Sequence, residues 1–159
     1  MGIEERRKRK KNLRFDEKGI KLALAILDKL EKPLELLYYL MKRERDRTFV
    51  IMLLSADEME LENLIKAEKR DSDLLFEIDK ENNLYALICQ ETKIDGGYRF
   101  AERFHRALEH KKIKNSYSVE IEVGSPRHEI KEVIFKLIET YMKAVNDERE
   151  GEIIYHSLQ

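Results

Sequence analysis

Residues 74–89 read LLFEIDKENNLYALIC, and this stretch decides the fold. Its two apolar runs, residues 74–78 and 84–89, have the length and the side chains of β-strands. Between them lies the polar segment 79–83, DKENN, whose residues suit a turn and include asparagines that tolerate left-handed backbone geometry. The stretch therefore predicts a β-hairpin.

The segments on either side of the hairpin predict an alternation of strands and helices. Residues 48–54, TFVIMLL, form a continuous apolar run that is typical of a central buried strand. Residues 117–123 alternate strictly, which predicts a half-buried strand with Glu120 and Glu122 on its solvent face. Apolar residues at helical spacing predict a helix after each of these three units. These helices are expected within residues 57–69, after Gly96-Gly97 as far as Leu108, and over residues 130–145, with a last edge strand at residues 152–156.

Two further helices are predicted ahead of the first strand. Asp16 can cap the first, an extra N-terminal helix over residues 16–32. Pro33 interrupts the helical pattern and suits the first turn of a second helix. This second helix is expected to end in the charged run at residues 42–47.

The order after the two leading helices is β-α-β-β-α-β-α-β, and its first six elements match the ferredoxin-like split βαβ plan. We therefore expect an α+β fold with a ferredoxin-like or nucleotide-cyclase-like βαββαβ core, in which helices pack on a mostly antiparallel sheet. The length of 159 residues suits a single domain, expected over residues 16–159. This plan hosts many functions, so the fold alone does not choose among them.

Charge is distributed unevenly along the chain. Residues 1–14 contain seven basic and two acidic residues and so carry +5, whereas the whole chain has a formal net charge of −1. We therefore expect residues 1–15 to be a flexible basic tail on an acidic body, which argues against a basic nucleic-acid clamp in the globular part. A lone cysteine, Cys89, excludes a disulfide framework. No transmembrane segment or secretory signal is expected, and the cytoplasm is the expected location.

Four local patterns resemble the GGDEF (diguanylate cyclase) domain over roughly residues 34–156. Arg70-Asp71-Ser72-Asp73 resembles the RxxD motif that the family places just before its hairpin. Phe100-Ala101-Glu102-Arg103-Phe104 resembles the family's AER segment, at a fitting distance from Tyr85. The helix that leads into the strand at residues 48–54, and the closing helix with its short strand, match in order. Jointly these patterns are moderately specific.

The family's defining motif, in the hairpin turn, is not retained. Aligning Tyr85 with the phenylalanine of that motif places Glu81, Asn82, Asn83 and Leu84 at its other four positions. Both glycines and the acidic pair are therefore missing. The resemblance implies that the glycines let the protein backbone approach the guanine nucleotide closely and that the acid holds a divalent metal.

A second expected metal ligand is also missing. The family carries an aspartate at the end of its first strand, where this chain has Ser55, with Asp57 two residues on. The following loop and helix, which in the family hold a lysine and a base-contacting asparagine, are shortened to residues 57–69. Two-metal phosphoryl transfer depends on such carboxylates. We therefore expect a degenerate domain without cyclase activity and without a resident cofactor or metal.

The residues that the resemblance does retain are Arg70, Asp73 and Arg103. In the family, the RxxD motif and an arginine on the neighbouring helix bind cyclic di-GMP at an inhibitory site. Arginine suits phosphate and the guanine edge, and a carboxylate can accept hydrogen bonds from guanine. The sequence thus predicts a cyclic di-GMP receptor at these three residues. The simpler interpretation is a surface ion pair at a helix end, and two extra residues between Asp73 and the turn favour it.

Other chemistry-bearing residues give weaker signals. His105 and His110 are spaced i and i+5 on one predicted helix, which is poor for a shared metal, and Cys89 is expected in the core. Three alternative functions stay open. They are a protein-interaction or homodimerisation module that uses the leading helix, a nucleic-acid-associated protein that uses residues 6–14, and an enzyme of altered chemistry that recruits Asp57 and Asp79.

Overall fold

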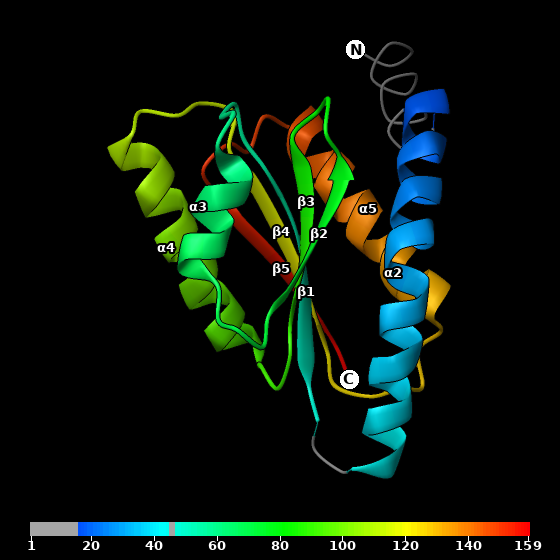
Figure 1. Ribbon diagram of the computed structural model, residues 1–159. Helices are drawn as coiled ribbons and strands as arrows, with labels where there is room; N and C mark the ends of the chain where they lie inside the picture. Colours follow the sequence, from blue (N-terminus) through cyan, green and yellow to red (C-terminus); the bar gives the residue numbers. More distant parts are fainter. Residues whose placement is uncertain (1–15, 45–46) are drawn as a thin grey trace, which may run out of the picture.

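The computed structural model describes residues 16–44 and 47–159, so the predicted basic tail lies outside the described residues. Within them, four helices pack on a five-stranded sheet, α2 and α5 on one face and α3 and α4 on the other (Figure 1). In chain order the elements are α2 (Glu17–Arg43), β1 (Phe49–Ser55), α3 (Leu61–Glu68), β2 (Leu74–Asp79), β3 (Leu84–Cys89), α4 (Ile94–His110), β4 (Tyr117–Val123), α5 (Ile130–Asn146) and β5 (Ile153–Leu158).

The sheet has the strand order β2-β3-β1-β4-β5. β1 lies at its centre and pairs antiparallel with β3 and β4, while β5 adds to the far edge, parallel to β4. The predicted hairpin is present as β2 and β3. The expected α+β fold, with helices on a mostly antiparallel sheet, is therefore confirmed.

The two leading helices of the sequence analysis are one continuous helix, α2, with Pro33 inside it. A proline in a helix interior lacks an N–H donor and costs about 3 kcal/mol. The helix continues because one unbroken apolar stripe runs through it, and Ile26, Leu30 and Leu34 on that stripe are fully buried. Burial of three large side chains stabilises by more than the proline costs, at roughly 1.5–3 kcal/mol each. The predicted cap is confirmed, since Asp16 Oδ1 accepts from the Gly19 amide at 2.7 Å.

Two hydrophobic cores lie on the two faces of the sheet. Ile51 and Leu53 of β1 point into the core beneath α2 and α5, and Val50, Met52 and Leu54 point into the core beneath α3 and α4. Because both faces are covered, every residue of β1 is buried. The prediction of a central buried strand is confirmed.

The prediction that Glu120 and Glu122 face solvent is wrong, because α4 covers that face of β4. Glu120 is 1% exposed. Gly97 allows the close approach, since a Cβ at that position would lie 3.2 Å from each Glu120 carboxyl oxygen and 3.0 Å from Val50. The sequence predicted that the glycine pair 96–97 precedes this helix. In the structure α4 already begins at Ile94, so both glycines lie inside it.

None of the helices in the described part of the chain is long and apolar enough to cross a membrane.

Candidate functional site

The predicted Arg70–Asp73 pair forms a compact cluster at the start of β2. The Asp73 carboxylate is buried and accepts from the Arg70 amide at 2.8 Å, from its Nε at 3.1 Å and from its Nη2 at 2.8 Å. This hydrogen bond to Asp73 raises the pKa of Arg70, so its charge is secure. The Arg70 side chain is 52% exposed, so one of its faces remains open to solvent.

Two further groups hold the Arg70 guanidinium in place, and sequence reasoning missed both. Nη2 donates to the Gln90 carbonyl at 2.9 Å and to Thr92 Oγ1 at 2.6 Å. These partners follow β3, about twenty residues along the chain, and reach Arg70 because β2 and β3 pair. No local signal in the sequence marks them. The cluster thus joins the turn before β2 to the segment between β3 and α4.

Arg103, the third predicted ligand residue, is held by a different partner. Its Nε lies 3.5 Å from Glu68 Oε2 at the end of α3, and its guanidinium lies 5.7 Å from the centre of the Phe100 ring. No contact joins Arg103 to the Arg70–Asp73 pair among the described residues. Glu68 and Arg103 are both partly exposed, and an ion pair of this kind contributes only about 0–1 kcal/mol.

At the opposite end of the sheet, the hairpin turn is ordered by its own side chains. Asp79 Oδ1 accepts from the backbone amides of Glu81 and Asn82 at 3.1 and 3.3 Å. Asn83 has a positive φ of 53° and donates from its side chain to the carbonyls of Ala56 and Glu58. The Asn83 amide therefore ties the turn to the loop after β1.

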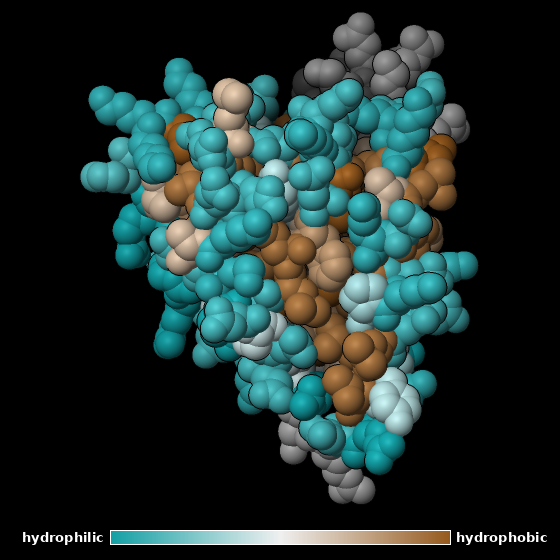
Figure 2. Space-filling view, in the orientation of Figure 1, coloured by the Kyte–Doolittle hydropathy of each residue, from teal (hydrophilic) through white to brown (hydrophobic). Residues whose placement is uncertain are grey.

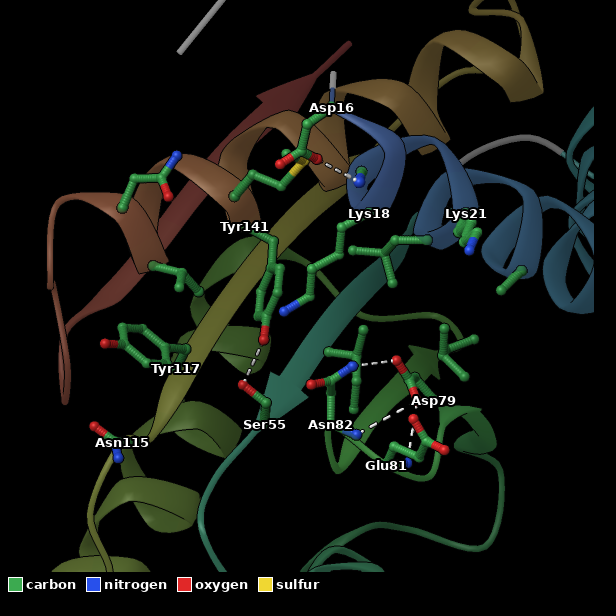
Figure 3. A pocket seen from close by; sticks show the side chains of 18 of the residues that line it. Asp16, Lys18, Lys21, Ser55, Asp79, Glu81, Asn82, Asn115, Tyr117 and Tyr141 are labelled. Carbon is green, nitrogen blue, oxygen red and sulfur yellow. Dashed lines mark hydrogen bonds between the residues drawn. The ribbon is translucent and has the colours of Figure 1, made fainter. Parts of the chain in front are cut away.

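Ser55 and Leu84, the two positions where the family would place metal carboxylates, are direct cross-strand partners. Both are buried, at 5% and 2% exposure. Ser55 Oγ lies 2.7 Å from the hydroxyl of Tyr141 on α5 (Figure 3). Burial raises the pKa of Tyr141, so this hydroxyl keeps its proton at neutral pH. No local signal in the sequence marks this bond, because its two residues are 86 positions apart.

A cavity of about 890 Å³ opens beside these two residues, between the first turns of α2, the hairpin turn and α5. Figure 3 shows the Lys18 side chain reaching into it toward Tyr141. A second hollow of about 720 Å³ adjoins it on the α3 side of the hairpin and is lined by Tyr85 and the loop after β1. Asp57 lies between the two hollows, and its Oδ2 accepts from Asn115 Nδ2 at 2.5 Å.

The polar side chains of β4 beneath α4 form a buried cluster that the sequence did not predict. Both carboxyl oxygens of Glu120 are buried without a hydrogen-bond partner. Burial raises the pKa of Glu120 to about 8, so the group is mostly neutral at pH 7. Glu122 instead accepts from the Ile94 amide at 2.5 Å and so caps α4 from a neighbouring strand.

His105 lies over the same face and bonds Ser118. Its Nε2 is 2.6 Å from Ser118 Oγ, and burial lowers the pKa of its imidazole. Cys89 is buried as predicted, and burial raises the pKa of its thiol, which makes it a poor nucleophile. Across residues 16–44 and 47–159, no three His, Cys, Asp or Glu side chains are grouped in a way that could hold a metal ion.

Comparison with solved structures finds the same arrangement of strands and helices in diguanylate cyclases. The GGEEF domain of a Vibrio cholerae diguanylate cyclase aligns with a TM-score of 0.59 at 11% identity, over 77% of this chain and 90% of that one. A Pseudomonas aeruginosa diguanylate cyclase, solved with its activator, aligns with a TM-score of 0.60 at 10% identity, over 79% and 56%.

The chain has a GGDEF-like fold. A diguanylate cyclase/phosphodiesterase from Caldicellulosiruptor saccharolyticus agrees, with a TM-score of 0.50 at 14% identity over 79% of this chain and 86% of that one. No protein-family model and no curated protein matches the chain in sequence. At such low identities the likeness concerns the fold, and the residues of this chain must carry any statement about its chemistry.

Proposed function

We propose that this GGDEF-like domain is a non-catalytic signalling domain. The observation that carries the proposal is the pairing of Ser55 with Leu84 at the end of β1. Divalent metals that hold phosphates need oxygen ligands, usually carboxylates. Leu84 offers none, and the Ser55 hydroxyl is already bonded to Tyr141. These two positions therefore offer no carboxylate for a metal that would hold a triphosphate, which supports the proposal.

We further propose that its ligand is cyclic di-GMP, bound through Arg70, Asp73 and Arg103. The buried Asp73 fixes the Arg70 guanidinium in one orientation, which lowers the entropy cost of meeting a phosphate. Arg103 is on α4, which packs beside α3, and its weak pair with Glu68 can be exchanged for a ligand. Binding would then replace the Arg103–Glu68 pair while the Arg70–Asp73 pair stays in place.

The test is isothermal titration of the full chain with cyclic di-GMP, with GTP and magnesium run in parallel. We expect binding at micromolar or tighter dissociation constants and no release of pyrophosphate from GTP. Arg70→Lys keeps the charge but loses the planar fork, so we expect at least about a tenfold loss of affinity. Arg103→Ala should weaken binding as well.

Two exposed basic residues serve as matched controls. Arg106 is on α4 near Arg103, and Lys66 is on α3 near Arg70. Their alanine variants should bind cyclic di-GMP as the wild type does. Binding that is equally strong in Arg70→Lys would show that the ligand uses another surface. Turnover of GTP by the wild type would overturn the non-catalytic assignment.

A second candidate function, a protein-interaction or dimerisation module, is favoured by exposed apolar side chains on α2. Leu24 and Leu36 are each 60% exposed, and Ile20 and Tyr39 are about half exposed. Figure 2 shows a strip of hydrophobic residues along the face where β2 and the C-terminal half of α2 lie. The P. aeruginosa relative in fold was solved with a protein activator.

This second candidate cannot be tested by deleting the leading helix, because Ile26 and Leu30 of α2 are fully buried in the main core. Exposed residues of α2 should be changed instead. If the module dimerises through α2, light scattering should give a dimer mass for the wild type and a monomer mass for Leu24→Ser with Leu36→Ser. The exposed Glu35→Ser is the control. A monomeric wild type removes the homodimer version.

A further inference from the structure

The larger cavity has a floor and a rim of different character. Its floor is apolar and combines residues of α2, β2, β3 and α5, among them Leu22, Ile78, Leu84 and Met142. Its rim is charged and begins at Asp16, the first described residue of the chain. Figure 3 shows Asp16 at the start of α2, on the same side of the hollow as Tyr141. We refer to this cavity as the groove.

The rim of the groove and of the adjoining hollow is strongly acidic. Nine carboxylates line the two, from residues 16–17, 57–62 and 77–81, against the three lysines Lys18, Lys21 and Lys80. One of these lysines, Lys21, is already paired with Glu17 at 3.2 Å. This end of the molecule therefore presents a negative field that favours a cationic occupant over a phosphate-rich one.

The chain itself carries a segment with the opposite charge. Residues 6–14 contain seven basic residues and no acidic one, and Leu13 and Phe15 are apolar. Because Asp16 lines the groove, this segment leaves the described fold at the rim. Nine residues span up to about 30 Å when extended, so the segment has length to run along the rim from Asp16.

We propose that residues 6–15 dock into the groove of their own chain, with the apolar side chains on its floor and the basic ones along its acidic rim. The segment would cover the end of the sheet that carries Ser55 and Leu84. Charge attraction at an exposed rim weakens with salt, so the docking is a salt-sensitive latch. Arg70 lies at the other end of the sheet, so this proposal does not depend on binding of cyclic di-GMP.

The test is disulfide trapping in the full chain with Asn12→Cys and Asn82→Cys, two uncharged positions in the segment and on the hairpin rim. Cys89 is buried and does not interfere. We expect an intrachain disulfide that forms at least about tenfold faster at low salt than in 0.5 M salt, because screening shortens the reach of the rim charges. Asn12→Cys with Glu102→Cys on α4, across the sheet, should react slowly at both salt concentrations.

A tethered segment also collides with its surroundings by chance, so the rim charge must be varied. Glu77→Gln with Glu81→Gln in the trapping background should slow the reaction several-fold. Glu102→Gln with Glu109→Gln on α4 removes the same charge elsewhere and should leave the rate unchanged. A rate that is insensitive to the rim charges and to salt would overturn the proposal. Disulfides that form between chains would overturn the intramolecular version in favour of an exchange of segments between two copies.

Discussion

Ser55 and Leu84 face each other as cross-strand partners at the end of β1 and the start of β3, in the place where the resemblance expects two carboxylates. Their environment is that of a core rather than of a metal site. Leu84 belongs to the main hydrophobic core, and Ser55 bonds Tyr141 on α5, the helix that packs on this face of the sheet. Through strand pairing and the hydrogen bond to Tyr141, the pair connects β1, β3 and α5.

The bond between Ser55 and Tyr141 should contribute to stability. We predict that Ser55→Ala and Tyr141→Phe each lower the free energy of unfolding by about 1 kcal/mol, because each leaves one buried hydroxyl without its partner. Urea denaturation of the two single variants and of the double variant measures the coupling. The double variant should lose less than the sum of the two single losses. Additive losses would mean that the two hydroxyls do not interact.

For Pro33 we predict that substitution increases the free energy of unfolding. Pro33→Ala restores a backbone donor within α2 and removes the ring clash, so the variant should unfold at higher urea concentration, with a gain of roughly 1–3 kcal/mol. The matched control is Glu35→Ala, an exposed change two residues away in the same helix, which should alter stability by less than about 0.5 kcal/mol. A loss of stability in Pro33→Ala would show that α2 needs its proline, for instance to bend around the sheet.

Pro33 also shows where sequence reasoning met its limit. The hairpin, the central strand and the later helices could be predicted because each depends on local periodicity and turn chemistry. The predicted break between two helices at Pro33 was wrong. The local cost of a proline inside a helix is smaller than the stabilisation from the long buried apolar stripe of α2. Only the tertiary contacts of Ile26 and Leu34 decide that balance.

The same reasoning explains the error at β4 and the partial view of the site. Alternation correctly predicted a strand, but an alternating polar face is exposed only if no helix covers it, and Gly97 lets α4 do so. At the candidate site, the simpler interpretation of the spacing of Arg70 and Asp73 was an ion pair at a helix end. The two residues do form an ion pair. Gln90 and Thr92 could not be predicted, because strand pairing brings them to Arg70.

The buried Glu120 should make stability fall as pH rises. Its pKa is about 8 in the folded protein against an ordinary value of 4.5, so between these values the folded state holds a proton that the unfolded state releases. Stability therefore declines from about pH 4.5 to about pH 8, by up to roughly 1.4 kcal/mol per pH unit, and stays low above that range. Thermal unfolding of Glu120→Gln against wild type should show the difference between them growing in favour of the variant over this range.

His105 is the neighbour that must be separated from this effect. Burial lowers the pKa of its imidazole below the ordinary value of 6.5. The contribution of His105 to stability therefore has the opposite sign: it increases with pH up to about 6.5 and is constant above that value. Comparing Glu120→Gln with wild type at each pH cancels the His105 contribution. Glu139→Gln, an exposed change on α5, is the control and should leave the pH profile unaltered. Parallel profiles for Glu120→Gln and wild type would mean that Glu120 is ionised in the folded protein.

Asp73 is expected to act on stability more strongly than its exposed neighbour. Asp73→Asn keeps the shape of the side chain but removes the charge from three hydrogen bonds with Arg70, and charge-assisted bonds of this kind contribute about 1.5–3 kcal/mol. We predict a loss of roughly 2 kcal/mol in urea unfolding. Asp71→Asn, two residues earlier and exposed, should cost less than about 0.5 kcal/mol. If Asp73→Asn were as stable as Asp71→Asn, the pair would be a marginal surface contact, and the preorganised Arg70 on which the proposed nucleotide site rests would be lost with it.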